Sequence, residues 1–427
     1  MNKNNKTTKR LVPFLSIGIC FAILLGVFYV TRDELAPDAK QIHDIVEKDA
    51  ESRGLTGKGI VVSHELLKSM GKYEEDSPTP YDYEEWESQN IQEPAHKQIH
   101  RIMSDEHPNW EALAWYASMN ECEYLAYPDE KAPDTELASC GYEKIGSTEN
   151  YDIYHHNEEE NYDESWLVTQ YGDPNGNQLM FYTLQNQKGD FIVVDGGWTT
   201  DAEFVKQTLT DLGSYVDAWI ITHPHSDHVG AFCEIYRNPG KLKIDRVYSV
   251  DMAPPELCLE NASWDDMSAY EDWLTLDISQ LTYVYSGDQF EIEGLDFHVL
   301  SAYEDVVDVI SNDLLNDGSM MFKVTAEEET MLFCADVGIN MTDHILNSVG
   351  GEQLKADYMQ IGHHGNGGLA DYFYRYVNPK ATFFDAPNWL MEDPEDRFTT
   401  PEHKQLMLDM GSEVYSFSTA PNQFVLY

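Results

Sequence analysis

The chain has 427 residues, which is more than one average domain, and 42% of them are hydrophobic. That hydrophobic fraction supports a sizeable core and excludes wholesale disorder. The charge is very uneven, with 76 acidic against 27 basic residues and a formal net charge of −49. A chain this acidic repels nucleic acid and anionic membrane faces by default, and it attracts cations.

The amino terminus has the pattern of a membrane anchor. Residues 1–10 are basic and contain no acid, and residues 11–30 (LVPFLSIGICFAILLGVFYV) are an uncharged apolar run. A helix of that length spans the roughly 30 Å hydrocarbon layer of a bilayer. A cleaved signal peptide is the alternative, but the run is long for one and no small-x-small cleavage pattern follows it. The sequence therefore predicts a cytoplasmic tail, a single-pass anchor in the cell membrane and an extracytoplasmic remainder.

Residues 31–164 are acidic and irregular. Apolar spacing predicts helices over 34–54 and 109–128, and the Pro- and acid-rich residues 74–94 are typical of a linker. We therefore expect an acidic stalk with a small helical region, and a surface loop around His155 and His156. An oxidising exterior permits a disulfide between Cys122 and Cys140, but their spacing does not decide whether they pair.

From residue 165 to residue 427 strands and helices alternate, which predicts an α/β domain. Strands are expected at 179–186 and 189–197, followed by an amphipathic helix at 202–213 and a buried strand at 216–222. Further strands and the helices between them are predicted in the rest of the domain, with strands at 243–250, 281–287, 290–300, 319–338, 358–365, 381–386, 413–418 and 423–427 and helices at 370–377 and 401–411.

A cluster of histidines follows the buried strand at 216–222. Residues 221–230 read ITHPHSDHVG and contain His223, His225, Asp227 and His228. In an extended segment residues two apart point the same way, so His223 and His225 project together, and Pro224 argues against a helix there. Imidazole and carboxylate groups at this spacing suit two adjacent metal ions of the zinc type. A merely hydrogen-bonded loop would not explain why the cluster directly follows an apolar strand.

Other strands also end in histidine or aspartate beside glycine. Asp195 follows FIVV, Asp336 follows MLFCA, and His363 and His364 follow YMQIG. Open sheets build their sites at the carboxyl ends of strands, where glycine lets the backbone come close. We therefore expect these side chains to meet the histidine cluster.

These motifs together resemble a known fold family. VDGG, the HxHxDH of residues 223–228, Asp336 and the HHG of 363–365 are similar to the successive motifs of the metallo-β-lactamase fold. GHHGNGG, NDGSMMFKV before Asp336 and the ending from NPKATFFDAPN onward are most similar to the metallo-β-lactamase-like domain of ComEC-type competence proteins. The likeness covers residues 165–427.

The resemblance implies a four-layer αβ/βα sandwich with a two-metal hydrolytic centre at one edge. It assigns His223 and His225 to the first ion, Asp227 and His228 to the second, Asp336 as a bridge and one of His363 and His364 to the second ion. Asp195 is implied as a supporting residue. The usual further histidine ahead of the bridging aspartate is missing, so Asn316 or Asp317 is expected to fill in; His298 is the one histidine in that interval and is better explained as a strand residue.

The predicted function is that of a membrane-anchored, extracytoplasmic, metal-dependent hydrolase. The expected cofactors are two divalent ions, zinc or alternatively manganese, and a hydroxide bridging them would attack a phosphoester or phosphodiester, with Asp227 and Asp336 as the catalytic carboxylates. The expected substrate is a small molecule or a cell-envelope phosphoester. Nucleic acid follows from the resemblance, but the charge of the chain disfavours it. A β-lactam or other acyl hydrolase, and a scaffold that has lost the reaction, remain alternatives.

Overall fold

The computed structural model describes residues 37–54, 59–62, 109–119, 122–128, 134–157, 162, 164–418 and 421–427. The predicted tail at 1–10 and anchor at 11–30 lie outside these residues. Within them, no helix is both long and apolar enough to cross a bilayer. The chain divides into two compact units, one made of residues 1–103 and 116–160 and the other of residues 104–115 and 161–427.

The smaller unit contains a four-stranded sheet with the order β1 (Gly59–Val62), β2 (Cys122–Pro128), β4 (Tyr151–His156) and β3 (Tyr142–Ser147). Helix α2 (Pro37–Arg53) confirms the predicted helix and buries Ile42 and Val46 against this sheet. The short helix α7 (Asp134–Ser139) precedes β3.

Two expectations for this region are corrected. It is a mixed α/β unit rather than a small helical one, because residues 122–128 continue as a strand and not as the end of the helix α6 (Trp110–Met119). His155 and His156 are buried in β4 and do not lie in a surface loop. Their polar and acidic neighbours concealed the strand, since Asp152 in the same strand is also buried.

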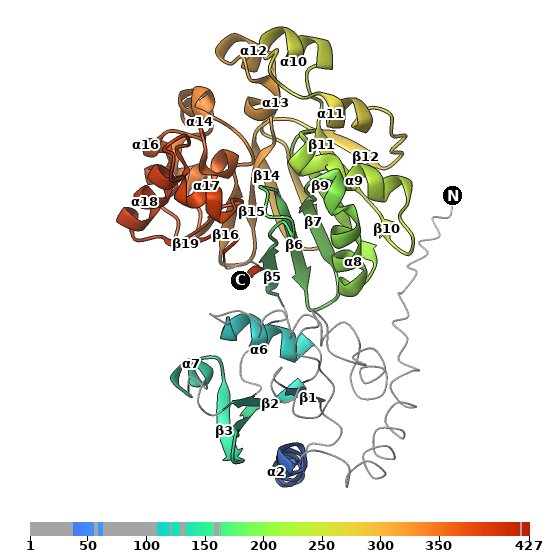
Figure 1. Ribbon diagram of the computed structural model, residues 1–427, viewed down its shortest axis with the longest axis vertical. Coiled ribbons are helices and arrows are strands. Elements are labelled where there is room, and N and C mark those ends of the chain that lie inside the picture. Colours follow the sequence, from blue (N-terminus) through green and yellow to red (C-terminus); the bar gives the residue numbers. More distant parts are fainter. Residues whose placement is uncertain are drawn as a thin grey trace, which may run out of the picture. The chain divides into compact units, whose positions relative to one another are not determined.

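The larger unit is built on two seven-stranded sheets (Figure 1). The first has the order β12 (Leu281–Val284), β11 (Val247–Val250), β9 (Ala218–Ile221), β7 (Phe191–Asp195), β6 (Phe181–Asn186), β5 (Trp166–Gln170) and β20 (Asn422–Leu426). The second has the order β13 (Gln289–Ile292), β14 (Leu295–Ser301), β15 (Met321–Thr325), β16 (Thr330–Phe333), β17 (Tyr358–Gln360), β18 (Ala381–Phe383) and β19 (Glu413–Tyr415). A small parallel pair joins β8 (Tyr215–Val216) to β10 (Lys243–Ile244).

Both sheets are mixed, with an antiparallel half and a parallel half. In the first sheet β7, β9, β11 and β12 run parallel, and in the second β16 to β19 do. Parallel strands are usually buried on both faces, and the all-apolar, fully buried β9 (AWII) follows that rule. The apolar run at 216–222 therefore predicted this strand correctly.

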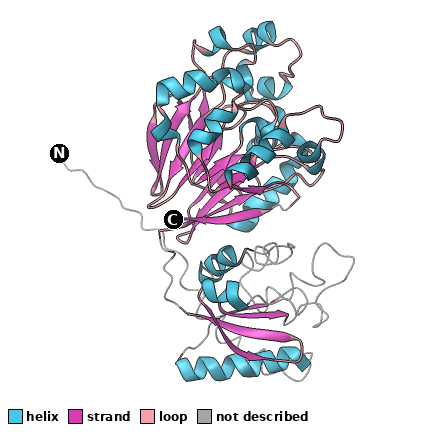
Figure 2. Ribbon diagram, turned by 90° about the vertical axis from the view of Figure 1, so that its left-hand side faces the viewer, coloured by secondary structure: helices cyan, strands magenta, loops and turns pink. Residues whose placement is uncertain are grey.

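Helices flank the two sheets. α8 (Ala202–Leu212) and α9 (Ser226–Arg237) lie beside the first sheet, while α14 (Thr342–Val349), α16 (Asp371–Val377), α17 (Asn388–Glu392) and α18 (Thr400–Met410) lie beside the second (Figure 1). Shorter helices connect the remaining strands: α10 (Pro255–Asn261), α11 (Ser268–Trp273), α12 (Val307–Ile310), α13 (Leu314–Asp317) and α15 (Gly351–Leu354). Figure 2 shows the helices and strands of this unit from a second side.

The core joins the two sheets into one body. The Tyr182 ring of β6 meets the Phe333 ring of β16 edge-on, with 5.2 Å between centroids. Phe322 stacks on Phe333 at 4.8 Å and continues the aromatic layer within the second sheet. Edge-on and offset ring pairs add to the stabilisation from buried area. The core therefore fixes the position of one sheet relative to the other behind the edge where the histidines lie.

Residues 109–115 also pack in the larger unit. The Trp115 indole donates to Ser165 at 2.9 Å, and the Tyr427 hydroxyl donates to Glu111 at 2.8 Å. The amino-terminal half of α6 is thereby tied to the residues beside β5 and β20, which are neighbouring strands at one edge of the first sheet.

Candidate metal centre

Four strands of the two sheets deliver their carboxyl ends to one edge. β7 ends at Asp195, β9 runs into His223, β16 leads to Asp336, and β17 leads to His363 and His364. Three of these exits pass through a left-handed backbone conformation on residues other than glycine, with φ of 52° at Asp195, 48° at Ala335 and 50° at His363. Such conformations are costly, and they concentrate at sites that need a side chain turned in a particular direction.

Asp195 holds the histidine loop from behind. Its carboxylate is fully buried and accepts the Thr222 amide at 2.8 Å and the Thr222 hydroxyl at 2.6 Å. The same carboxylate lies 2.8 Å from Nδ1 of His228. A carboxylate on one ring nitrogen fixes the tautomer and leaves the other nitrogen as the ligand. Nε2 of His228 is thus directed into the centre, 3.3 Å from Asp336.

One side of the centre is formed by Asp227, His228 and His364, whose ligand atoms all lie within 4.8 Å of one another. Nε2 of His364 is 3.2 Å from Asp227 and 3.4 Å from Asp336. Nδ1 of His364 faces the backbone carbonyl of Asp385 at 2.9 Å. His364 therefore has the same arrangement as His228, with one nitrogen anchored and the other directed at two carboxylates.

The second group is His223, His228 and Asp336, so that His228 belongs to both groups, and His225 adjoins His223. The ligand atoms of His223, His228 and Asp336 lie within 4.8 Å of one another, and Nε2 of His223 is 2.9 Å from Nδ1 of His225. As the alternation around Pro224 predicted, the two imidazoles project together. Asp336 adjoins both groups, because it is a member of the group with His223 and its Oδ2 is also 3.4 Å from Nε2 of His364.

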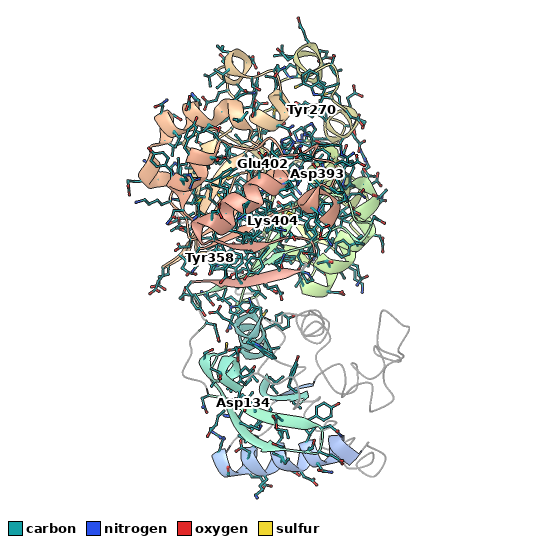
Figure 3. The ribbon with its side chains drawn as sticks, turned by 60° about the vertical axis from the view of Figure 1, so that its left-hand side comes forward. Asp134, Tyr270, Tyr358, Asp393, Glu402 and Lys404 are labelled. Atoms are coloured by element: carbon teal, nitrogen blue, oxygen red, sulfur yellow. The ribbon has the colours of Figure 1, made fainter. Side chains whose placement is uncertain are left out.

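Asp265 is a functional candidate that the sequence analysis missed. Its two carboxylate oxygens lie 3.0 and 3.1 Å from Nε2 of His225. It comes from the segment between α10 and α11. The Tyr270 hydroxyl of α11 donates to the carbonyl of Met252 and so ties α11 to the chain ahead of α10 (Tyr270 is labelled in Figure 3). Nothing in the local sequence distinguishes this aspartate from its neighbour Asp266.

His363 lies at the open side of the centre. Its side chain is 29% exposed, whereas that of His364 is 2% exposed. Nε2 of His363 is 3.9 Å from Oδ2 of Asp336. The two neighbouring histidines thus approach the same carboxylate from different directions.

Asn316 and Asp317 differ in what their side chains do. The Asp317 carboxylate accepts the Ser311 hydroxyl and the Gly338 amide, the latter at 2.7 Å, and so ties two loops together. Asn316 donates to Asp313 at 2.9 Å, and its buried Oδ1 has no hydrogen-bond partner among the described residues. The Asp317 carboxylate is thus occupied by hydrogen bonds between loops, whereas Asn316 retains one buried acceptor atom. His298 pairs across the sheet from β14, away from the cluster, in register with Gln289 and Lys323.

Burial and neighbouring charges set the protonation of the histidines. Burial lowers the pKa of His223 well below its ordinary value, and His228 and His225 add to that effect. Burial also opposes protonation of His364, but the carboxylates of Asp336 and Asp227 outweigh it and raise its pKa to about 10. The pKa of His228 is likewise raised well above its ordinary value, because Asp336 and Asp195 outweigh the burial.

The cluster fits divalent metal ions. Nε2 of His228, Nε2 of His364 and Oδ1 of Asp336 are buried without a hydrogen-bond partner within the described part of the chain. Buried polar atoms normally find partners, and leaving them without one costs free energy. Imidazole nitrogens and carboxylate oxygens on opposite sides of one shared aspartate are the donor set of paired transition-metal ions. A cation on each side would satisfy all three atoms.

An α/β domain with two mixed sheets and two overlapping His–Asp groups at one edge is typical of metal-dependent hydrolases. Residues 176–244, which hold the HxHxDH motif, match the model of the Metallo-beta-lactamase superfamily. This match assigns residues 176–244 to the superfamily, and the resemblance to the ComEC type is supported by a curated relative.

That relative is ComE operon protein 3 of Bacillus subtilis (strain 168), which is 24% identical over 267 residues. The match covers 58% of this chain and 31% of the relative. Hydroxyacylglutathione hydrolase of Serratia proteamaculans (strain 568) is 40% identical over 63 residues, 15% of this chain and 24% of that protein. The chain thus spans about a third of one relative and a quarter of the other. Among solved structures, the metallo-beta-lactamase fold protein YhfI from Bacillus subtilis aligns with a TM-score of 0.39 at 12% identity, covering 61% of this chain and 99% of YhfI.

Proposed function

We propose that this chain is a metal-dependent hydrolase of phosphoester or phosphodiester bonds, held at the outer face of the cell membrane by residues 11–30. The observation that carries the proposal is the buried convergence of Asp227, His228, Asp336 and His364. Within the described chain, one buried atom each of His228, Asp336 and His364 has no hydrogen-bond partner. Groups that fold with unpaired donor and acceptor atoms at one point are arranged for a ligand rather than for stability.

We assign the residues to two ions as the family resemblance implies. His223 and His225 would hold the first, Asp227, His228 and His364 the second, and Asp336 would contact both. When bound, such a pair of ions supplies a hydroxide nucleophile near neutral pH and polarises the oxygen of the scissile ester.

The chain's own residues keep this ligand set in place. Asp195 and the carbonyl of Asp385 each occupy the outer nitrogen of one histidine, so neither imidazole can rotate without losing a buried hydrogen bond. Partners of this kind raise ligand basicity and hold ring orientation. Asp227 lies in the first turn of α9, where the helix amino terminus favours a negative charge. Burial raises the pKa of Asp227 and Asp336, but His364 and His228 outweigh it and lower both pKa values, so the two catalytic carboxylates are held ionised inside a buried centre.

The charge of the chain favours a small phosphoester, or a phosphodiester within a cell-envelope polymer, over nucleic acid. A polyanion would have to approach a protein with a formal net charge of −49. Two alternatives share the same residues: hydrolysis of a β-lactam or another acyl substrate, since the same nucleophile attacks carbonyls, and a scaffold without activity.

The test uses the full chain purified in detergent. We expect one or two transition-metal ions per chain by elemental analysis, and chelator-sensitive hydrolysis of bis(p-nitrophenyl) phosphate exceeding that of a chromogenic cephalosporin. Replacing His225 and Asp227 together by alanine should remove the activity and most of the metal. His344→Ala, a histidine of α14 outside the cluster, is the matched control. Absence of metal from the wild-type chain would favour the scaffold, and preferential cephalosporin hydrolysis would favour the acyl alternative.

A further inference from the structure

A cavity lies beside the metal centre, at the same carboxyl edge of the first sheet. β9 leads to His223, and its parallel neighbour β11 leads to Asp251. The cavity has a volume of about 210 Å³ and is lined by Asp251, by residues of α11 and by Tyr283 of the next parallel strand, β12. Pro224, within the histidine loop, also lines it. Ligands of such sheets bind at the carboxyl ends of strands, so the cavity is a candidate subsite next to the centre.

Three aromatic side chains line the cavity. Tyr270 and Trp273 of α11 are buried, whereas Tyr283 is exposed. The Tyr270 hydroxyl donates to the carbonyl of Met252 at 3.2 Å, and the Trp273 ring lies 5.5 Å from the Phe232 ring, centroid to centroid. The protein itself therefore fixes the two buried rings, and Tyr283 lies nearer to solvent.

The helix that carries the two buried rings is tied to the metal centre at two points. Arg237 in the last turn of α9, the helix that carries His228, donates to both carboxylate oxygens of Asp272 in α11, at 2.9 and 2.6 Å. Asp265, just ahead of α11, contacts His225 at 3.0 Å. A group held against α11 would therefore keep a defined position relative to the histidine loop.

The charge of the cavity lining favours a cation. The lining residues, all of which lie in the described part of the chain, include the exposed Asp251 but no lysine, arginine or histidine. An anionic group would meet this carboxylate without a basic side chain to offset it. The faces of tyrosine and tryptophan rings attract cations through the ring quadrupole. A neutral ring could pack on the same side chains, but only a cation also gains from Asp251 and from the net charge of −49.

We propose that this cavity binds a positively charged group of the substrate, a primary amine or a quaternary ammonium, while the metal centre acts on a phosphoester of the same molecule. The inference rests on the proposed function and narrows its substrate class to phosphoesters with a cationic substituent. Asp251 supplies the opposite charge, and the aromatic side chains supply the walls. A phosphodiester that carries one such group has no net charge, so it approaches this acidic chain without the repulsion that a polyanion meets.

The binding test uses the metal-depleted full chain in a non-ionic detergent, so that its outcome does not depend on catalysis. Isothermal titration calorimetry compares choline with 3,3-dimethylbutan-1-ol, a neutral molecule of the same shape. We expect choline to bind at least about 3-fold more tightly than the alcohol, because only choline carries the charge. Asp251→Asn and Tyr283→Ala should each weaken choline binding by roughly 3-fold to 30-fold, and Tyr283→Phe, which keeps the ring, should weaken it less.

The chain offers matched controls for both cavity variants. Glu256→Gln removes a negative charge from an exposed residue of α10, and Tyr285→Ala removes an exposed ring two residues after Tyr283; neither residue lines the cavity. Both control variants should bind choline as the wild type does. Equal affinity of the wild type for choline and for the neutral alcohol, or wild-type choline affinity in both Asp251→Asn and Tyr283→Ala, would overturn the proposal and leave the metal centre untouched.

The second measurement is hydrolysis by the metal-loaded chain. We expect a higher kcat/KM for p-nitrophenyl phosphorylcholine than for bis(p-nitrophenyl) phosphate. Asp251→Asn should reduce this preference mainly through KM, because the cavity binds a part of the substrate that does not react, and Tyr285→Ala should leave the preference unchanged. A lack of preference in the wild type would refute the role of the cavity in substrate choice. Choline binding with the expected losses but no hydrolysis of either ester would support the cavity and refute the proposed function.

Discussion

Asp265 offers the most direct test of how the outer shell supports the centre. Its carboxylate oxygens lie 3.0 and 3.1 Å from Nε2 of His225. The His225 side chain is 14% exposed and the Asp265 side chain 15%. A hydrogen bond to a charged group contributes about 1.5–3 kcal/mol, and 1.4 kcal/mol corresponds to a factor of ten in affinity. Because both side chains are partly exposed, we expect this hydrogen bond to contribute a free energy near the lower end of that range. We therefore expect Asp265→Ala to weaken binding of the first ion by roughly 10-fold to 30-fold.

The measurement is the dissociation constant of each ion, obtained by competition with a chromogenic chelator. Asp265→Asn keeps one acceptor oxygen and should lose less affinity than Asp265→Ala. Glu271→Gln, at an exposed position on the neighbouring helix α11, is the control for the loss of one negative charge. Wild-type affinity in Asp265→Ala, or an equal loss in Glu271→Gln, would show that the contact does not position His225.

Three further outcomes follow from the structure. Gly230→Ala should lower the free energy of unfolding by about 1–3 kcal/mol, because an added Cβ would lie 2.5 Å from the Thr199 amide nitrogen; Gly196→Ala, with its nearest neighbour at 3.4 Å, should change the thermal midpoint far less, and equal effects would contradict the reasoning. Metal uptake at pH 8 should release a proton from His364, whose pKa is raised to about 10; calorimetry in buffers of different ionisation enthalpy measures this, and a heat independent of the buffer would refute it. Burial and the nearby Asp173 raise the pKa of Asp201 to about 6, above its unfolded value, so its ionisation destabilises the fold as pH rises from about 4 to above 6; Asp201→Asn should flatten that part of the stability curve in denaturant titrations, and an unchanged slope would exclude the effect.

The ligand candidates could be found from the sequence because each follows a strand. Strand ends at the carboxyl edge of a parallel sheet converge, so a list of strand ends carrying His or Asp is also a list of neighbours. This reasoning brought together Asp195, His223, Asp336 and His364, which the structure places at one edge.

Asp265 could not be found in this way. It lies 40 residues after His225, in an irregular segment between two short helices, and it is one of 76 acidic residues. Its role depends on how the segment between α10 and α11 meets His225, which is a tertiary contact with no periodic signal. The four-stranded sheet of the smaller unit was not predicted from the sequence for a related reason. Its buried positions include polar residues such as Asp152 and His155, so burial and hydrophobicity do not coincide.

The sequence also did not predict which of the two side chains, His363 or His364, is buried in the centre. A pattern of two adjacent histidines predicts a turn, but not which imidazole faces inward. That depends on two consecutive left-handed residues, a conformation that a sequence signals only when glycine occupies it. Glycines do follow, at Gly365 and Gly367, and both have positive φ. The glycines of this segment therefore predict a tight turn, but they do not predict that the left-handed backbone begins at the two histidines.

The local charge of the centre separates small substrates from polymeric ones. Two carboxylates, Asp227 and Asp336, with neutral imidazoles would carry less negative charge than two divalent ions carry positive charge, so a loaded centre attracts an anionic ester. Outside the centre, the electrostatic repulsion by the acidic surface decays over a screening length of about 8 Å at physiological ionic strength. A small phosphoester fits within that length, so the ions dominate its binding. A nucleic acid extends over many such lengths and meets the repulsion of a chain with a net charge of −49 along its whole contact, which favours the small or envelope-bound phosphoester as the substrate class.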